Sequence, residues 1–344
     1  MHLSDFDFPF DSELIASQPV LPRDGARLLV LRPPSPSFDH LSVRDFPDLL
    51  EPGDLVVVND TRVLPARVVG RKQVSGGSVD MLFVRELPDG SWAVLLKGHV
   101  RSGLRLDVAP STWVVVQSRD AGRTTVRVEG ALSARELFEH HGRMPLPPYI
   151  KRDPTDEDRI WYQTIFAGKE GAIAAPTAAL HFTPDLVTRL RDREVGFATV
   201  TLHVGLGTFK PVTAERVEDH RMEQESVEVN EKTVAAIHQT RAAGRRVIAI
   251  GTTVVRALES AACAENGLVP YRGDTSLFVT PGFQFRAVDA LLTNFHLPKS
   301  TLLMLVSAFG GRELVRNAYQ EAVAARYRFY SYGDAMFIVN RDRP

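Results

Sequence analysis

The sequence predicts an α/β protein with a small all-β domain inserted near its start. Apolar, β-branched segments alternate with helical patterns before residue 62 and after residue 153. Between them, residues 63–150 hold short β-type runs separated by glycine-containing turns. The proline-rich stretch PLPPYIKR, residues 145–152, is typical of a stiff, extended exit from that insert. We therefore place the α/β domain at residues 1–62 and 151–344, and the inserted domain at residues 63–150.

Length and composition are those of an ordinary globular enzyme. A chain of 344 residues, 44% hydrophobic and 24% charged, can bury a core without a disulfide or metal to hold it. The one cysteine, Cys263, excludes an intramolecular disulfide, and we expect it to be a small buried residue. The stretch MHLSDFDFPFDSELI lacks a basic region followed by an apolar one, and the longest late apolar run, residues 302–306, is too short to span a bilayer. We expect a cytoplasmic protein that is not membrane-bound.

The first part of the α/β domain ends in a polar cluster. Residues 28–31 form a strand, residues 12–15 and 45–50 form short helices, and residues 55–58 form a buried strand. That apolar strand runs directly into Asn59, Asp60, Thr61 and Arg62. A site at the strand end explains this cluster, and a turn that only reverses the chain explains it equally well.

The inserted domain is predicted to be a small barrel or sandwich. Five strands are expected, at residues 67–71, 78–85, 91–96, 113–118 and 124–129, followed by a helix at 134–141. Residues 63–150 carry 12 Lys and Arg against 8 Asp and Glu, whereas the whole chain has a net charge of −1. A basic face for a polyanion and an ordinary solvated surface both fit this excess.

After residue 153 the helix–strand alternation returns. Helices are expected at residues 156–166, 184–193, 231–243 and 313–327, and a further apolar helix begins at Ser300 or Thr301. Strands are expected at 198–204 and 247–250, within 275–285, and before the end of the 329–339 run. A helix that begins at Thr252 or Thr253 after Gly251 offers free N–H groups to a carboxylate or phosphate, with Arg256 one turn further on.

Two histidines lie at the ends of one helix–strand unit. His181 precedes the helix at 184–193, and His203 follows the strand that begins at 198, just before Gly205 and Gly207. Both histidines could equally be packed and hydrogen-bonded inside the protein. Candidate site residues share a position at strand ends or in turns: Asp60, Arg62, Thr177, His181, His203, Glu225, Thr252, Thr253, Arg256, Asn294 and His296.

The motifs of several common enzyme classes are absent from the sequence. There is no G-x-G-x-x-G, no Walker A sequence, no G-x-S-x-G and no H-E-x-x-H. We therefore expect no dinucleotide or P-loop chemistry and no metal. The residues alone indicate an enzyme with a site lined by His, Arg and Asp, and they do not name its reaction.

Ordered motifs along nearly the whole chain resemble the S-adenosylmethionine:tRNA ribosyltransferase-isomerase family of queuosine biosynthesis. They are RDGARLLVL, DLVVVNDTRVLPAR, GRMPLPPYIKR, YQTIFA, AAPTAALHFT, LHVGLGTFKPV, GTTVVRALES, TNFHLPKSTLLMLVSAF and YRFYSYGDAM. The resemblance implies an α/β domain with an inserted antiparallel β-barrel. It also implies that the ribosyl part of S-adenosylmethionine is transferred to 7-aminomethyl-7-deazaguanine at the tRNA wobble position and isomerised to epoxyqueuosine, with release of adenine and methionine.

The implied chemistry assigns roles to the candidate residues. The sulfonium acidifies the neighbouring ribose carbon, so a base is needed, and His203 or His181 would supply it. Adenine leaves more easily when protonated, and Asp60 or His296 would supply the acid. Arg256 and the helix start at Thr252 and Thr253 would hold the methionine carboxylate. The resemblance implies S-adenosylmethionine as co-substrate, no prosthetic group and no metal, with tRNA as partner, and we expect a monomer.

The chain departs from the family pattern at four places. Ala179 replaces the usual Gly, Glu223 the usual His, Ala26 the usual Ser, and Lys97-Gly98 the usual Lys-Pro. Two alternatives follow: a divergent paralogue that uses S-adenosylmethionine on another acceptor, and a non-catalytic RNA-binding protein. A pure RNA binder would have no need of His181, His203, Arg256 and Asn294.

Overall fold

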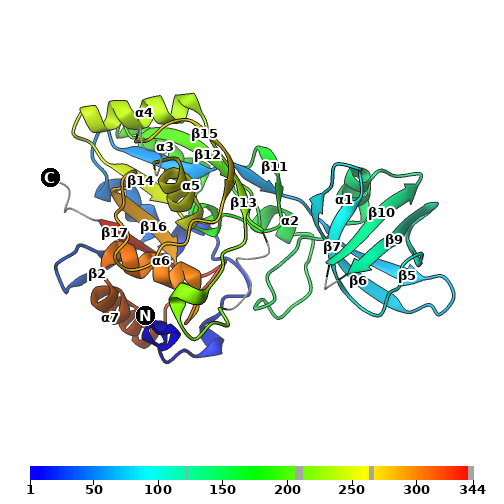
Figure 1. Cartoon of the computed structure of the whole chain (residues 1–344). Coiled ribbons are helices and arrows are strands. Elements are labelled where there is room, and N and C mark those ends of the chain that lie inside the picture. Colours follow the sequence, from blue (N-terminus) through cyan, green and yellow to red (C-terminus); the bar gives the residue numbers. More distant parts are fainter. Residues whose placement is uncertain (121–122, 206–211, 263–266, 340–344) are drawn as a thin grey trace.

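Two lobes make up the molecule in a computed structural model that describes residues 1–120, 123–205, 212–262 and 267–339. The larger lobe is built on a nine-stranded sheet, and a closed six-stranded barrel stands at its side (Figure 1). The predicted fold class, an α/β domain with an inserted antiparallel barrel, is confirmed. Cys263 and Gly207 lie outside the described residues.

The large sheet is mixed. Its spatial order is β15 (Tyr271–Thr275), β13 (Glu225–Val229), β12 (Gly196–Leu202), β3 (Leu55–Asn59), β14 (Val247–Ile250), β16 (Ala290–Asn294), β17 (Ala335–Val339), β1 (Arg27–Leu31) and β2 (Phe38–Ser42). The four strands from β12 to β16 are parallel, so their carboxyl ends meet at one edge. The chain leaves β3 towards β12 on one side and leaves β14 towards β16 on the other, which makes the gap between β3 and β14 a topological switch point.

Alternating side chains fill two cores, one on each face of the sheet. In β3, Leu55 and Val57 point into one core, and Val56 and Val58 point into the other. The first core is covered by α4 (Glu231–Ala242), α5 (Thr252–Ala262), α6 (Thr301–Gly310) and α7 (Arg312–Ala324). The second is covered by α3 (Pro184–Asp192) and the 3₁₀ helices η4 (Val43–Leu49) and η5 (Thr177–His181). Because both faces are buried, the central strands read as continuous apolar runs.

The barrel closes in the order β10 (Arg123–Gly130), β7 (Trp92–Lys97), β6 (Ser78–Glu86), β5 (Arg67–Lys72), β8 (Arg105–Ala109) and β9 (Thr112–Asp120). Helix α1 (Ala134–His141) caps its core, with the Phe138 ring 4.9 Å from Phe83 and 5.1 Å from Trp92. The sequence prediction had five of these strands and missed β8, whose exposed positions are polar.

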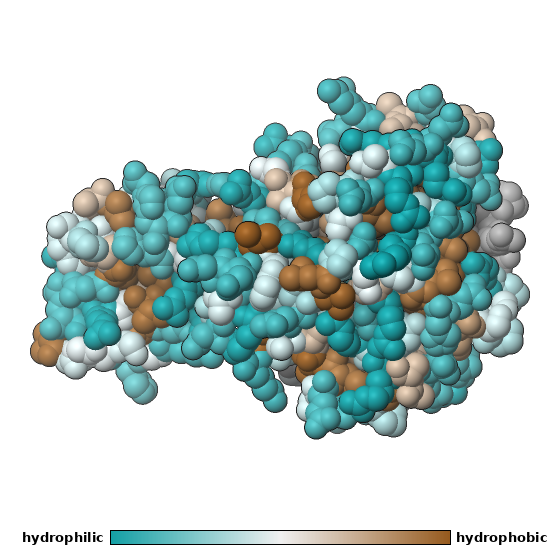
Figure 2. Space-filling model, turned by 180° about the vertical axis from the view of Figure 1, so that it is seen from behind, coloured by the Kyte–Doolittle hydropathy of each residue, from teal (hydrophilic) through white to brown (hydrophobic). Residues whose placement is uncertain are grey.

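A two-stranded parallel ribbon joins the lobes. Its strands are β4 (Thr61–Val63), which leads into the insert, and β11 (Lys169–Ala172), which returns from it. Figure 2 shows the two lobes from behind, with a mostly hydrophilic surface broken by small hydrophobic patches. The exact domain boundaries predicted from the sequence stay a prediction.

Several predicted elements differ from the observed ones. The predicted helix at 156–166 is only α2 (Asp158–Trp161), since the buried Tyr162 leaves the helical conformation with φ −95° and ψ 28°. The segment at 45–50 is part of the 3₁₀ helix η4, since Pro47 removes a backbone donor. The residues at 12–15 form a 3₁₀ turn, η2 (Ser12–Leu14), and short 3₁₀ turns also occur at η1 (Leu3–Phe6), η3 (Arg23–Gly25) and η7 (Val217–Asp219). The strand expected within 275–285 is absent from the described structure, because β15 ends at Thr275 and the next strand begins at Ala290. Strands β2, β4, β11, β13 and β16 were not predicted.

Candidate functional site

Asn59 fastens three elements at the carboxyl edge of the sheet. Its fully buried side chain follows the apolar run of β3. The Asn59 Oδ1 atom accepts hydrogen bonds from the backbone of Leu202 and Thr61, each at 3.1 Å. The Nδ2 group donates to the Leu202 carbonyl at 2.9 Å and to Thr253 Oγ1 at 3.4 Å. The polar cluster after β3 therefore ties β12 and the start of α5 to the switch point.

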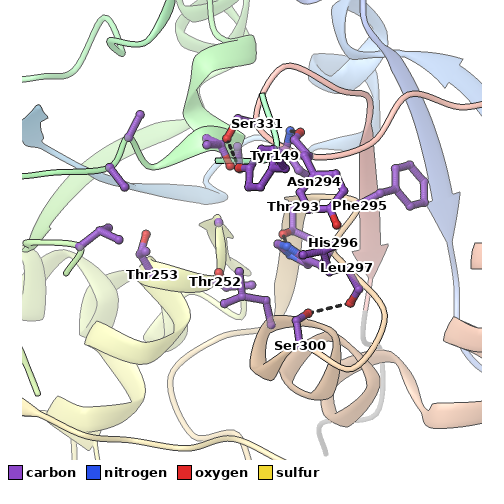
Figure 3. A pocket seen from close by; sticks show the side chains of 18 of the residues that line it. Tyr149, Thr252, Thr253, Thr293, Asn294, Phe295, His296, Leu297, Ser300 and Ser331 are labelled. Atoms are coloured by element: carbon purple, nitrogen blue, oxygen red, sulfur yellow. Dashed lines mark hydrogen bonds between the residues drawn. The ribbon is translucent and has the colours of Figure 1, made fainter. Parts of the chain in front are cut away.

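A cavity of about 560 Å³ opens at this edge, and we call it the edge pocket. Figure 3 shows Thr252 and Thr253 on one side and the segment from Thr293 to Leu297 on the other. Further walls come from residues 174–178 before and within η5, from Tyr149 on the exit from the barrel, and from Tyr330 and Ser331. The volume lies in the range of small-molecule sites. Of the predicted residues, the pocket brings together Thr177, Thr252, Thr253, Asn294 and His296.

Two helices begin at the wall of the edge pocket. Helix α5 follows Gly251, whose φ of 96° suits glycine and which has no side chain to cap the helix. Helix α6 begins after Ser300, which also lines the pocket and accepts from the backbone of Leu303 at 3.2 Å. Among the described lining residues there is no carboxylate. Free N–H groups and the positive ends of both helices therefore favour a ligand carboxylate here.

His296 lines the edge pocket as an uncharged side chain. Its Nε2 atom lies 2.9 Å from Thr293 Oγ1, and its backbone N–H donates to the Tyr319 hydroxyl at 3.0 Å. Burial lowers the His296 pKa to about 3. At neutral pH the ring is therefore uncharged, and the one N–H that it keeps is too weak an acid to protonate adenine. This lowered pKa argues against the predicted role of His296 as general acid.

His203 lies just outside the pocket, next to Val204, which lines it. The Nδ1 atom is 2.7 Å from Thr61 Oγ1, and the ring rests against Gly171, where a Cβ would come within 2.9 Å of it. Asp60 lies beside it and accepts from Thr201 Oγ1 at 2.6 Å. Partial burial lowers the His203 pKa, and the negative charge of Asp60 opposes that effect. His203 is therefore a neutral imidazole, and the carboxylate of Asp60 would stabilise its protonated form.

His181 lies behind the pocket and does not line it. It borders a separate cavity of about 10 Å³, together with Arg23, Ala26 and Arg328. Only 5% of the residue is exposed, and burial lowers its pKa to about 4. The space is roughly that of one water molecule. His181 is thus buried, as the alternative interpretation expected, but its Nε2 atom has no hydrogen-bond partner among the described residues, so both interpretations of its sequence position stay predictions.

Arg256 and Glu225 form a buried ion pair. Arg256 Nη1 donates to Glu225 Oε2, both side chains are less than 5% exposed, and the backbone N–H of Gly205 donates to Glu225 Oε1 at 3.2 Å. Neither residue lines the edge pocket as described. Glu225 pairs with Nη1 of Arg256, whereas the buried Nε of Arg256 has no hydrogen-bond partner among the described residues. That Arg256 holds a ligand carboxylate therefore stays a prediction. The pair anchors Gly205 next to His203.

The remaining predicted position and the departures from the family pattern lie away from the pocket wall. Arg62 is exposed on β4, in register with Glu170 of β11. Ala26 and Ala179 are buried in the second core, and Glu223 is exposed. None of these residues lines the edge pocket, so the departures leave its described walls unchanged.

Sequence reasoning missed the aromatic residues of the pocket. Tyr149 and Tyr330 have ring centroids 4.3 Å apart, and the Tyr149 hydroxyl is 2.6 Å from Ser331 Oγ. Both lie within motifs quoted above, GRMPLPPYIKR and YRFYSYGDAM, so the signal was present in the motifs without a role attached. Within the described residues, no group of three or more His, Cys, Asp and Glu side chains is placed to hold a metal ion, and no helix is long and apolar enough to cross a membrane.

Comparison with known proteins gives full-length matches. The family model described as queuosine biosynthesis protein matches residues 3–338. An S-adenosylmethionine:tRNA ribosyltransferase-isomerase of Aquifex aeolicus is 47% identical over 98% of this chain and 100% of its own length. That of Stenotrophomonas maltophilia is 49% identical over 98% of both. The crystal structure of the S-adenosylmethionine tRNA ribosyltransferase from Thermotoga maritima matches with a TM-score of 0.58 and 37% identity, covering 98% of this chain and 100% of that one.

Proposed function

Because the chain belongs to the queuosine biosynthesis protein family of S-adenosylmethionine:tRNA ribosyltransferase-isomerases, we propose that it acts on 7-aminomethyl-7-deazaguanine at the tRNA wobble position. In this reaction the ribosyl part of S-adenosylmethionine is transferred and isomerised, epoxyqueuosine forms, and adenine and methionine leave. The observation that carries the proposal is the edge pocket, which opens at the switch point of the sheet and is walled by two helix starts.

S-adenosylmethionine fits the chemistry of the edge pocket. The apolar part of the wall, from Ala174, Ala175, Pro176, Val204 and Phe295, suits a nucleoside. The start of α5 at Thr252 and Thr253, which follows Gly251 and lines the pocket, suits the methionine carboxylate. No resident cofactor is needed, since the sulfonium of the substrate already activates the ribose.

His203 is the base that this arrangement favours. A general base works best with a pKa near the operating pH. Burial lowers the pKa of His181 to about 4 and that of His296 to about 3, which makes both too weakly basic. His203 is only partly buried, and Asp60 beside it favours the protonated form that proton abstraction creates. We assign Asp60 to support His203 in this way.

A second cavity, of about 770 Å³, suits the tRNA backbone. This barrel groove lies between the barrel and the exit segment at residues 145–153. Lys97, Arg119 and Lys151 line it and are exposed. Two more lining cations are held in ion pairs, Arg67 with Asp80 at 2.6 Å and Arg152 with Asp158 at 2.6 Å. The exit segment continues to Pro148 and Tyr149, which reach the edge pocket, so RNA in the groove would lie close to the reaction.

Changing Lys97, Arg119 or Lys151 singly to Ala should weaken tRNA binding without changing S-adenosylmethionine binding. Each lost phosphate contact should lower the slope of log Kd against log salt by about 1. Lys232→Ala, on the exposed side of α4, is the matched control and should leave the slope unchanged. Fluorescence titration of tRNA at several salt concentrations measures this. Equal slopes for all four variants would remove the barrel groove from tRNA binding.

The proposed function is tested by adenine release from S-adenosylmethionine. We expect release with tRNA that carries 7-aminomethyl-7-deazaguanine, and none with the same tRNA carrying guanine. Release with a different acceptor would identify a paralogue with another substrate. No release with any RNA, together with tight tRNA binding, would identify a non-catalytic RNA-binding protein.

A further inference from the structure

Tyr330 is held in a backbone conformation that its side chain disfavours. Its φ is 71°, in the left-handed region that residues with large side chains rarely adopt. Three hydrogen bonds fix it there. The Tyr330 N–H donates to the Phe295 carbonyl at 3.1 Å, and its own carbonyl accepts from the Gly333 N–H at 2.9 Å and from Asn294 Nδ2 at 2.8 Å. Strained residues of this kind persist where the surrounding structure holds them, and they concentrate at ligand sites.

This geometry leaves two buried polar atoms unused. The Tyr330 hydroxyl and the Asn294 Oδ1 atom are both buried and have no hydrogen-bond partner among the described residues. Tyr330 is 6% exposed and Asn294 is 2% exposed, and both residues line the edge pocket. A buried donor or acceptor without a partner destabilises the free protein, so native structures keep few of them and usually for a reason.

The neighbouring tyrosine has its hydroxyl already satisfied. The Tyr149 ring packs against that of Tyr330 with a tilt of 36°, and the Tyr149 hydroxyl lies 2.6 Å from Ser331 Oγ. Burial raises the Tyr330 pKa above its ordinary value, so its hydroxyl stays neutral and can donate. Tyr330 therefore offers a donor and Asn294 an acceptor on the same wall of the edge pocket. The hydrogen bond from Asn294 Nδ2 to the Tyr330 carbonyl holds the two residues side by side.

We propose that Tyr330 and Asn294 recognise the adenine of S-adenosylmethionine, with the hydroxyl donating to a ring nitrogen and Asn294 Oδ1 accepting from the exocyclic amino group. The inference rests on the proposed function. Adenine presents an acceptor next to a donor on one edge, and an Asn side chain is well suited to read it. The methionine end also carries an acceptor and a donor, its carboxylate and its ammonium, but the free N–H groups at the start of α5 suit that carboxylate better. The methionine end is left to the start of α5, across the pocket.

Tyr330→Phe tests the assignment because it keeps the ring contact and removes only the hydroxyl. In the free protein we expect the melting temperature to stay the same or rise, because the lost group had no partner. We expect S-adenosylmethionine to bind about tenfold more weakly, the effect of one hydrogen bond. Tyr327→Phe is the matched control. The Tyr327 hydroxyl bonds His40 Nδ1 at 2.9 Å, outside the pocket, so this variant should lose stability and bind S-adenosylmethionine normally.

Calorimetric titration with S-adenosylhomocysteine and its inosine analogue gives a second readout. The analogue replaces the amino group by a carbonyl and turns the ring acceptor beside it into a donor. Wild-type protein should prefer the adenine compound, and Tyr330→Phe should lose the part of that preference that the ring nitrogen provides, while Asn294 still distinguishes the amino group from the carbonyl. A Tyr330→Phe variant that binds and discriminates like wild type overturns the adenine assignment alone. Wild-type protein that binds neither S-adenosylmethionine nor S-adenosylhomocysteine overturns the proposed function as well.

Discussion

Replacing His203 by Ala should lower kcat for adenine release about 10²- to 10⁴-fold, the usual contribution of a general base. The KM for S-adenosylmethionine should change little, because a general base acts in the transition state and contributes little to binding the substrate. His238→Ala is the matched control, since His238 lies on α4 with its Nε2 atom 3.1 Å from the Leu268 carbonyl, away from this edge. Steady-state kinetics with saturating modified tRNA measures the effect.

The pH profile distinguishes a base from a structural histidine. The His203 pKa is lowered by burial, so the neutral form that abstracts a proton predominates above that lowered pKa. The rate should therefore rise with pH through a value below 6.5 and level off near neutrality. His203→Ala should lack this rise. A His203→Ala enzyme with wild-type kcat and an unchanged acidic limb would remove His203 from the mechanism.

Replacing Glu225 by Ala should destabilise the larger lobe by about 3–5 kcal/mol, because it leaves the Arg256 charge buried without its partner. Glu228→Ala on the same strand is the matched control. Glu228 pairs with Lys169 at 3.0 Å, but both side chains are about a third or more exposed, so its loss should cost under about 1 kcal/mol. Urea unfolding, followed by a signal from the larger lobe, measures the difference.

The same variants separate two roles for the buried pair. If Glu225 and Arg256 only anchor the loop at Gly205, a double change to two leucines should recover much of the lost stability. If Arg256 bound the methionine carboxylate, the recovered variant would still show a greatly raised KM for S-adenosylmethionine. A loss of stability no larger than that of Glu228→Ala would contradict the buried-pair account.

The sequence predicted most of the strands that are buried on both faces. The run Leu55–Asn59 is continuously apolar until its last residue because each side chain enters one of the two cores. The antiparallel strands near the edges of the sheet were harder to predict from the sequence. Glu225–Val229 carries two glutamates, one paired with Arg256 and one with Lys169, and such charges read as loop when their partners are unknown. Ala290–Asn294 is also buried on both faces, but it was not predicted as a strand from the sequence.

The sequence predicted individual residues of the candidate site, but not the contacts between residues that lie far apart in the chain. Strand ends drew attention to Asn294, Thr252 and Thr253, and the edge pocket contains them. Pairings between distant positions were out of reach. Arg256 was predicted to bind a ligand, but its buried ion pair with Glu225, 31 residues earlier, was not predicted. Tyr149 and Tyr330 meet although 181 positions separate them, and no local pattern indicates that contact.

The arrangement of S-adenosylmethionine in the edge pocket is the central claim, and a crystal structure of the chain with S-adenosylmethionine or S-adenosylhomocysteine tests it most directly. We predict density for adenine against Tyr330 and Asn294, with the carboxylate at the start of α5 beside Thr252 and Thr253. The sulfur and the adjacent ribose carbon should then face the side of the pocket where His203 lies. A ligand bound in the barrel groove, or one in the edge pocket with its adenine at the start of α5, would contradict this account.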